Sequence, residues 1–296
     1  MNRRTRLACG VAALPLLLAG CGTSGSGSER PEPEASASPA RKPEPPPLDA
    51  GLDYQLGGAY RPDGDVQVVV RDHGARPVRG LYNVCYVNAF QAQPGARGWP
   101  EELLLRDARG REVIDEDWDE VLLDLSTDEL RRAAAARVGR WIDGCAQRGF
   151  DAVEPDNYDS FTRSDGLLDA ADAQAYLALL VERAHSRGLA VAQKNTAELA
   201  GDRKRLGLDF AVAEECGQYE ECGVYDKAFD GRVLVVEYTE KGLERACEAA
   251  DGRLSVVLRD RDVLPEDEEG YVRGPAEARG MGSGTGDSEH RYRPIW

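Results

Sequence analysis

Histidine and closely spaced cysteines are scarce in this sequence. Its 296 residues contain three scattered histidines, His73, His185 and His290, and no CxxC pair. Structural and catalytic zinc sites are usually built from Cys and His at short, regular spacings. The sequence therefore argues against a zinc protein, and we expect neither a bound metal ion nor a cofactor.

Long apolar runs are also lacking. The one extended apolar run near the N-terminus follows Arg3, Arg4 and Arg6 and is too short to span a bilayer permanently. It ends in "LAGC", residues 18–21, which resembles a bacterial lipobox in which Cys21 is acylated. An ordinary secretory signal with an incidental cysteine is the alternative. We expect a lipid-anchored protein on the extracellular face of the cell membrane.

Basic charge is in short supply. Lysine and arginine total 37 against 53 aspartates and glutamates, for a formal net charge of −16. Such a surface repels nucleic acid and attracts cationic partners, although solubility alone would explain it equally well. We expect a monomer that binds no nucleic acid.

Composition divides the chain into four parts. Residues 1–20 form the predicted signal peptide, and residues 21–50 form a tether that holds 7 of the 16 prolines and little that could enter a core. Residues 51–273 have no second linker, which favours one large domain. Residues 274–296 are Gly-rich and are predicted to be a flexible tail.

Short apolar runs alternate with helical or loop segments through the large domain. Nine candidate strands can be identified, in residues 53–58, 65–72, 81–88, 120–125, 150–156, 189–195, 210–216, 232–238 and 254–260. Most show no polar alternation, as expected of parallel strands that are covered on both faces. This α/β pattern predicts a (β/α)8 barrel with one candidate strand too many, and a doubly wound open sheet is the alternative.

Five cysteines remain once Cys9 is cleaved away and Cys21 is acylated. Cys216 and Cys222 lie close together in "ECGQYEEC" and form the obvious local pair. Cys85 with Cys145 is a weaker second pair, which leaves Cys247 over. An oxidising exterior permits such disulfides.

Carboxylates and amides gather at the C-terminal ends of the candidate strands. The clearest example is "FDAVEPDN", an apolar strand that ends in Glu154, Asp156 and Asn157. In a barrel these ends converge on one face, where barrel enzymes build their active sites. A ring of carboxylates suits glycoside hydrolysis by a carboxylic acid and a carboxylate, or chemistry at a divalent metal ion. Periodicity and composition leave both open.

Five blocks of the sequence carry a family resemblance. In order, "LYNVCYVNAFQAQP", "FDAVEPDNYDSF", "AHSRGLAVAQKN", "VAEECGQYEEC" and "VLVVEY" resemble those of the endo-α-1,4-polygalactosaminidases, glycoside hydrolase family 114. The resemblance runs from about Asp53 to Tyr271. It implies a glycosidase barrel that retains anomeric configuration and hydrolyses α-1,4-linked, partly N-acetylated galactosamine polymers.

The resemblance also implies roles for individual residues. The catalytic pair falls on Asp156 as nucleophile and Glu214 as acid/base. Contacts to the sugar or to its ammonium groups are expected from Asp124, Glu154, Asn157, Lys194, Asn195 and Glu237. Tyr238 is a further expected substrate contact and, with Tyr86, Tyr158 and Tyr219, a candidate sugar platform. A Cys216–Cys222 bridge would hold the loop that follows Glu214.

Three positions depart from the family pattern. Tyr54 stands where a tryptophan is common, Ala213 where asparagine is common, and Glu215 where glutamine is common. Two other functions therefore stay in view: a carbohydrate-binding lipoprotein without catalysis, and a metal-dependent barrel hydrolase.

Overall fold

The computed structural model describes residues 42–93, 98–249 and 252–275. The predicted signal peptide, Cys21, most of the tether and residues 276–296 of the tail lie outside these ranges. Within them, no helix combines the length and the apolar character that crossing a membrane requires.

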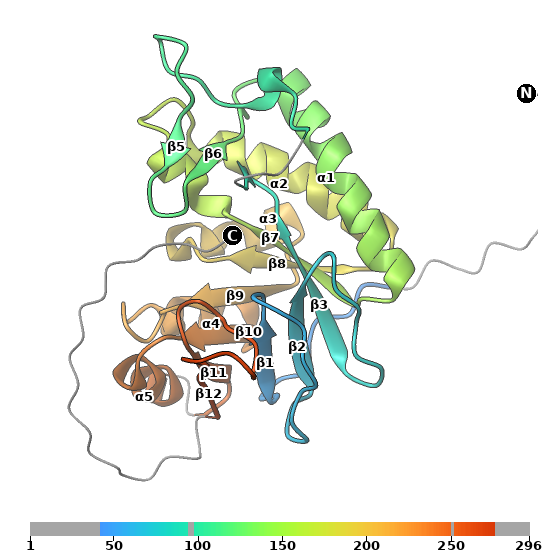
Figure 1. The fold of residues 1–296 in the computed structure, drawn as a ribbon, viewed down its shortest axis with the longest axis vertical. Helices are drawn as coiled ribbons and strands as arrows, with labels where there is room; N and C mark the ends of the chain where they lie inside the picture. Colours follow the sequence, from blue (N-terminus) through green and yellow to red (C-terminus); the bar gives the residue numbers. More distant parts are fainter. Residues whose placement is uncertain (1–41, 94–97, 250–251, 276–296) are drawn as a thin grey trace, which may run out of the picture. The chain divides into compact units, whose positions relative to one another are not determined.

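Eight parallel strands form the wall of a nearly closed barrel (Figure 1). Neighbouring strands in the barrel are also neighbours in the order of the chain, whereas a doubly wound sheet would reverse its order partway. The predicted (β/α)8 barrel is therefore confirmed. The strands are β1 Leu52–Gln55, β2 Val68–Asp72, β3 Tyr82–Asn88, β7 Ala152–Asp156, β8 Ala190–Lys194, β9 Phe210–Glu214, β10 Val233–Glu237 and β11 Ser255–Arg259.

Side chains help to close the barrel between its first and last parallel strands. A short ninth strand, β12 Arg273–Pro275, pairs antiparallel with β11. Its Arg273 donates a hydrogen bond to the backbone carbonyl of Leu52 on β1 at 3.3 Å. Asp53 is fully buried beside this seam, 3.6 Å from Arg273 and 3.9 Å from Arg259.

Helices cover the outside of the barrel from β3 onward (Figure 1). The α-helices are α1 Asp128–Arg148, α2 Ala170–Ser186, α3 Arg203–Leu206, α4 Cys222–Phe229 and α5 Glu240–Ala249, and the 3₁₀ turns are η1 Glu101–Leu103, η2 Tyr158–Arg163 and η3 Ala197–Asp202. The longest helix, α1, begins at Thr127, whose side chain accepts from the Leu130 amide. It ends at Gly149 in the left-handed conformation (φ 91°), which glycine adopts without strain.

Both predicted disulfides are present. Cys85 on β3 is bonded to Cys145 on α1, which fixes the helix to the barrel wall. Cys216 is bonded to Cys222 across the loop after β9. Cys247 is the remaining thiol, half-buried and free.

The surplus strand candidate, residues 120–125, lies outside the barrel. Its first half forms β6 Glu120–Leu122, which pairs antiparallel with β4 Gln91–Ala92 and β5 Ile114–Asp115 in a separate small sheet. The sequence predicted one strand candidate more than a barrel needs without identifying it, and the structure identifies it as this one. An apolar run alone does not reveal whether a strand pairs with the barrel or with an insertion.

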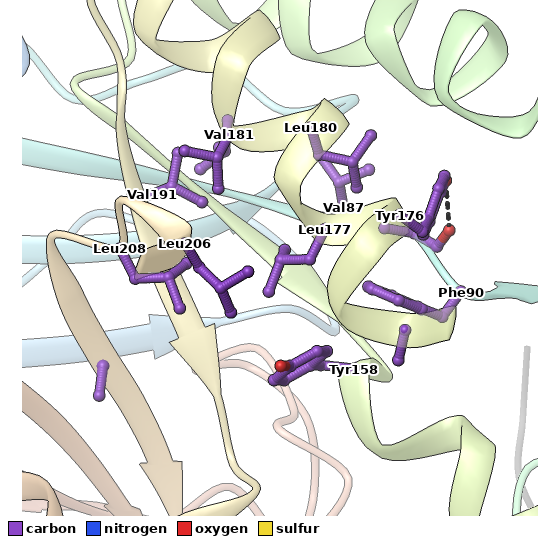
Figure 2. Packing of buried hydrophobic residues seen from close by; sticks show 14 of the residues in the cluster. Val87, Phe90, Tyr158, Tyr176, Leu177, Leu180, Val181, Val191, Leu206 and Leu208 are labelled. Atoms are coloured by element: carbon purple, nitrogen blue, oxygen red, sulfur yellow. Dashed lines mark hydrogen bonds between the residues drawn. The ribbon is translucent and has the colours of Figure 1, made fainter. Parts of the chain in front are cut away.

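Alternation along the strands divides the core in two. One set of side chains fills the barrel, including Val70, Val84 and Val212. The residues between them point outward and pack against the helices. Figure 2 shows part of this outer core, where Val87 and Val191 from the strands meet Leu177, Leu180 and Val181 of α2 together with Phe90, Tyr158, Tyr176, Leu206 and Leu208.

The segment before β1 crosses the N-terminal end of the barrel. The Glu44 carbonyl accepts from the Tyr82 hydroxyl at the start of β3, and the Pro46 carbonyl accepts from Arg232 just before β10. The Ala50 amide donates to the Ser255 hydroxyl at the start of β11. Residues 44–50, which composition assigns to the tether, therefore line the face opposite the C-terminal strand ends.

This packing predicts that residues 42–50 stabilise the barrel. A chain beginning at residue 51 loses these three hydrogen bonds, and its free energy of unfolding should be about 2–4 kcal/mol lower than that of a chain beginning at residue 42. Urea denaturation of the two chains measures the difference. Equal stability would show that the segment only lies on the surface.

Candidate active site

The C-terminal end of the barrel interior is polar. The inward positions that are apolar deeper in the barrel become Tyr86, Glu154, Asp156, Lys194 and Glu214 at the upper ends of four adjacent strands. Because side chains alternate along a strand, these residues lie on the same inner surface as the buried valines below them. The charged residues of these strands therefore lie together at the C-terminal end of the barrel, where the parallel strands converge.

Lys194 lies at the centre of this group. Its ammonium nitrogen is 2.8 Å from Asp156 Oδ1, 3.2 Å from Glu214 Oε2 and 3.0 Å from Glu154 Oε1. Only 3% of the lysine is exposed. Burial alone would lower the pKa of Lys194, but the surrounding carboxylates outweigh it and raise that pKa well above its usual value. Lys194 is therefore a fixed positive charge.

Asp156 is held as a carboxylate. Its Oδ2 accepts a 2.6 Å hydrogen bond from the Tyr86 hydroxyl, and its Oδ1 accepts from Lys194. Burial opposes ionisation of Asp156, but Lys194 and these hydrogen bonds prevail and lower its pKa below the usual value. A carboxylate that stays ionised suits a nucleophile.

Glu214 has a different set of partners. Its Oε2 accepts from the Asn195 side chain at 3.1 Å, and its Oε1 accepts from the Tyr238 hydroxyl. Asn195 also accepts from the Glu214 backbone amide at 2.8 Å, so the side chain and the backbone of Glu214 are held together. A hydroxyl can donate or accept, so Tyr238 can hold Glu214 in either protonation state.

The two carboxyl groups lie close together. Lys194 Nζ is 2.8 Å from Asp156 Oδ1 and 3.2 Å from Glu214 Oε2, so these oxygens are at most the combined 6.0 Å apart. Retaining glycosidases hold their carboxyl groups about 5–5.5 Å apart, and inverting ones roughly 6.5–9.5 Å apart. The geometry fits the retaining class.

Glu154 lies beneath this pair rather than beside the substrate. It is fully buried and accepts a 2.7 Å hydrogen bond from the Tyr54 hydroxyl as well as the contact from Lys194. Burial raises the pKa of Glu154 to about 7. The expected contact between Glu154 and a sugar ammonium group is therefore not supported, because Lys194 and Tyr54 separate it from the open face.

Glu237 faces away from the barrel interior. On β10 the inward residues are Leu234 and Val236, so alternation turns Glu237 outward. There it is fully buried and accepts a 2.6 Å hydrogen bond from the Gly217 amide, in the loop closed by the Cys216–Cys222 bridge. The expected sugar contact of Glu237 is corrected to a buried support for that loop.

Asp124 does not reach the site either. It follows β6 of the small sheet, and its Oδ1 accepts from the amide and the hydroxyl of Ser126 in the turn before α1. The expectation for Asp124 rested on a barrel strand at residues 120–125, and that strand is not part of the barrel.

Glu120 is a site residue that sequence reasoning missed. It is buried at the start of β6 and accepts 2.7 Å and 3.5 Å hydrogen bonds from the amides of Asn88 and Asn157. Burial raises the pKa of Glu120 to about 7, and the nearby charge of Asp156 adds to the effect. No local signal in the sequence marks Glu120, because its place depends on the pairing of β6 with β4 and β5.

An open cleft of about 320 Å³ runs over Glu214. Of the aromatic residues considered as sugar platforms, Tyr219 and Tyr238 line it, and so does Trp118, which the sequence analysis missed. Tyr219 is 62% exposed, as a platform requires. Tyr158 is instead buried in the outer core beside Phe90 (Figure 2). The Tyr86 hydroxyl donates its hydrogen bond to Asp156.

One group in the described part of the chain has the spacing of a metal site. It consists of Cys216, Cys222 and Glu237. The two sulfurs are bonded to each other, so neither is available as a thiolate ligand.

The sequence and the fold were compared with those of known proteins. The profile of Glycoside-hydrolase family GH114 matches residues 32–277. The fold is similar to that of Aspergillus fumigatus Ega3 in complex with galactosamine, with a TM-score of 0.62 and 21% identity over 77% of this chain and 97% of that one. It is also similar to the glycoside hydrolase domain of PelA from Pseudomonas aeruginosa, with a TM-score of 0.52 and 14% identity over 75% and 97%.

The comparison with curated sequences returns no match. The family match nevertheless spans most of the chain, and the similar glycoside hydrolase structures share its barrel fold. This chain belongs to glycoside-hydrolase family GH114 and is a glycoside hydrolase.

Proposed function

We propose that the chain cleaves α-1,4-linked galactosamine polymers by a retaining mechanism, with Asp156 as nucleophile and Glu214 as acid/base. The observation that carries the proposal is one buried lysine that holds both carboxylates within 6.0 Å of each other, by distances of 2.8 Å and 3.2 Å, at the mouth of a barrel. The galactosamine bound to the structurally similar Ega3 and the acidic charge of this chain support a cationic amino-sugar substrate.

The chemistry takes two displacements. Protonated Glu214 gives its proton to the glycosidic oxygen while an Asp156 oxygen bonds to the anomeric carbon, and the bond to the leaving sugar breaks with its electrons on that oxygen. Glu214 then removes a proton from water, which attacks the same carbon and releases Asp156. Lys194 keeps Asp156 ionised between turnovers.

Replacing either carboxyl group should abolish catalysis. Asp156→Asn removes the nucleophile and Glu214→Gln removes the proton donor, so each should lower kcat at least about 1,000-fold while the fold is kept. Release of reducing ends from partly deacetylated α-1,4-galactosaminan, with EDTA present, measures the loss. Glu182→Gln, exposed on α2, is the matched control and should retain full activity.

Three results would contradict this proposal. Cleavage that EDTA stops would favour metal-dependent hydrolysis, and polymer binding without cleavage would favour a carbohydrate-binding lipoprotein. Release of the β-anomer first, observed by proton NMR, would contradict retention at an α-linkage.

The charge of Lys194 also predicts a pH effect. Lys194→Met removes the cation that stabilises ionised Asp156, so the pKa of Asp156 should rise. Because only the carboxylate attacks, the acid limb of the kcat/KM profile should then move to higher pH. Profiles of the wild type and the variant between pH 3 and 8 measure the shift, and an unchanged acid limb would argue against Asp156 as the titrating nucleophile.

We further propose that a lipid on Cys21 anchors the enzyme at the extracellular face of the cell membrane. The "LAGC" sequence supports this, and residues 44–50 join the barrel on the face opposite the cleft. Cys21→Ser should move the protein from the membrane fraction into the medium with its activity per molecule unchanged. Retention of the variant in the membrane fraction would show a different anchor.

A further inference from the structure

The cleft carries one positive side chain among the described residues that line it. That residue is Arg261, in the loop after β11, and the cleft also presents five carboxylates, those of Asp159, Glu198, Glu214, Glu215 and Glu221. A lone cation is unexpected in a cleft proposed to bind a polycation, because it repels ammonium groups. Its position therefore bears on which sugars the cleft accepts.

Two contacts fix Arg261 at the edge of the cleft. Its Nη2 is 2.8 Å from Glu215 Oε1, and its guanidinium lies over the Tyr238 ring, 5.4 Å from the ring centroid. Tyr238 in turn donates to Glu214. The arginine side chain is still 59% exposed, and its other N–H groups make no hydrogen bond to the described residues. They are free to donate to a ligand.

The order of strands separates this cation from the free carboxylates. Glu198 follows β8 and Glu221 lies in the loop after β9, whereas Arg261 follows β11 on the other side of β10. Neither Glu198 nor Glu221 forms an ion pair with the described residues. Glu214 ends β9, so it lies between Glu198 and Arg261 in the circuit of strands, whereas Glu221 belongs to the loop of the same strand as Glu214. A polymer that crosses the cleft from β8 towards β11 thus meets Glu198 on one side of Glu214 and the guanidinium of Arg261 on the other.

Glu215 explains why the arginine stays in place. Its carboxylate is mostly buried and engaged by Arg261, so it offers little free negative charge to an ammonium group. The glutamate at this position therefore serves to hold Arg261 rather than to add a second acid beside Glu214. This assigns a role to the residue where the family pattern commonly has glutamine.

We infer that Arg261 selects an N-acetylated galactosamine on its side of the scissile bond, while Glu198 accepts a deacetylated sugar on the other. An acetamido group is uncharged, and its carbonyl oxygen accepts a charge-assisted hydrogen bond from a guanidinium. An ammonium group at the same place would meet a like charge and leave the donor unpaired. The enzyme then cuts where acetylated and deacetylated stretches meet.

This inference rests on the proposed function, and end-group analysis of the products tests it. The wild-type enzyme digests α-1,4-galactosaminan in which about half of the sugars are N-acetylated. Mass spectrometry then identifies whether the sugar at each new chain end is acetylated. One of the two new ends should be enriched in N-acetylgalactosamine. In Arg261→Gln the enrichment should disappear, and the ratio of kcat/KM for half-acetylated over fully deacetylated polymer should fall about tenfold.

Two further variants make the outcome decisive. Glu215→Gln, which keeps Arg261 but weakens its anchor, should reduce the enrichment partially, and Arg132→Gln, exposed on α1, should leave it unchanged. Melting temperatures show whether each variant folds.

The possible results separate the two proposals. Cleavage without enrichment, or enrichment that survives in both Arg261→Gln and Glu215→Gln, overturns this inference and leaves the proposed function standing. No cleavage of either polymer by the wild type overturns both.

Discussion

The buried ammonium group of Lys194 is the interaction on which the active site depends. It lies within 3.2 Å of an oxygen from each of Glu154, Asp156 and Glu214. Three carboxylates this close cannot all remain ionised without a cation among them, and a buried lysine cannot remain charged without carboxylates. The lysine therefore stabilises the ionised carboxylates, and the carboxylates stabilise the charged lysine. The barrel wall provides the rigid support, because all four residues lie on adjacent strands.

Unequal surroundings then give the carboxyl groups different tasks. Asp156 accepts hydrogen bonds from Lys194 and Tyr86, which keep it ionised. Glu154 is buried more deeply, and burial raises its pKa to about 7. Glu214 takes its hydrogen bonds from an amide and a hydroxyl, Asn195 and Tyr238, on the side that opens to the cleft. Distinct environments for paired carboxyl groups are how acid and base roles are divided in such enzymes.

The sequence predicted most of the fold for physical reasons, whereas the choice of Asp156 and Glu214 as the central pair came from the family resemblance. Unbroken apolar runs and well-marked helices predicted the barrel, and the strand ending at Asp156 predicted the polar rim. Strand parity could also have corrected one expectation, since Glu237 is out of phase with the inward Leu234 and Val236. Asp124 and Glu120 were not predictable in this way. Their places depend on pairing within the small sheet, which is a long-range contact that no local pattern encodes.

The buried charged side chains of the barrel form two groups, one at the active site and one at the seam. Around β7 to β9 the inward groups are mainly acidic with one lysine. At the seam, Arg259 and Arg273 lie 3.9 Å and 3.6 Å from the buried Asp53, and each also pairs with more exposed aspartates. Tyr54 on β1 stands between the two groups, since its hydroxyl bonds Glu154 while its strand forms the seam. Asp53, which helps to close the barrel, is therefore adjacent in sequence to Tyr54, whose hydroxyl lies 3.3 Å from the ammonium group of Lys194. Substitutions at the seam should act on the active site through that strand, even though none of the seam residues lines the cleft.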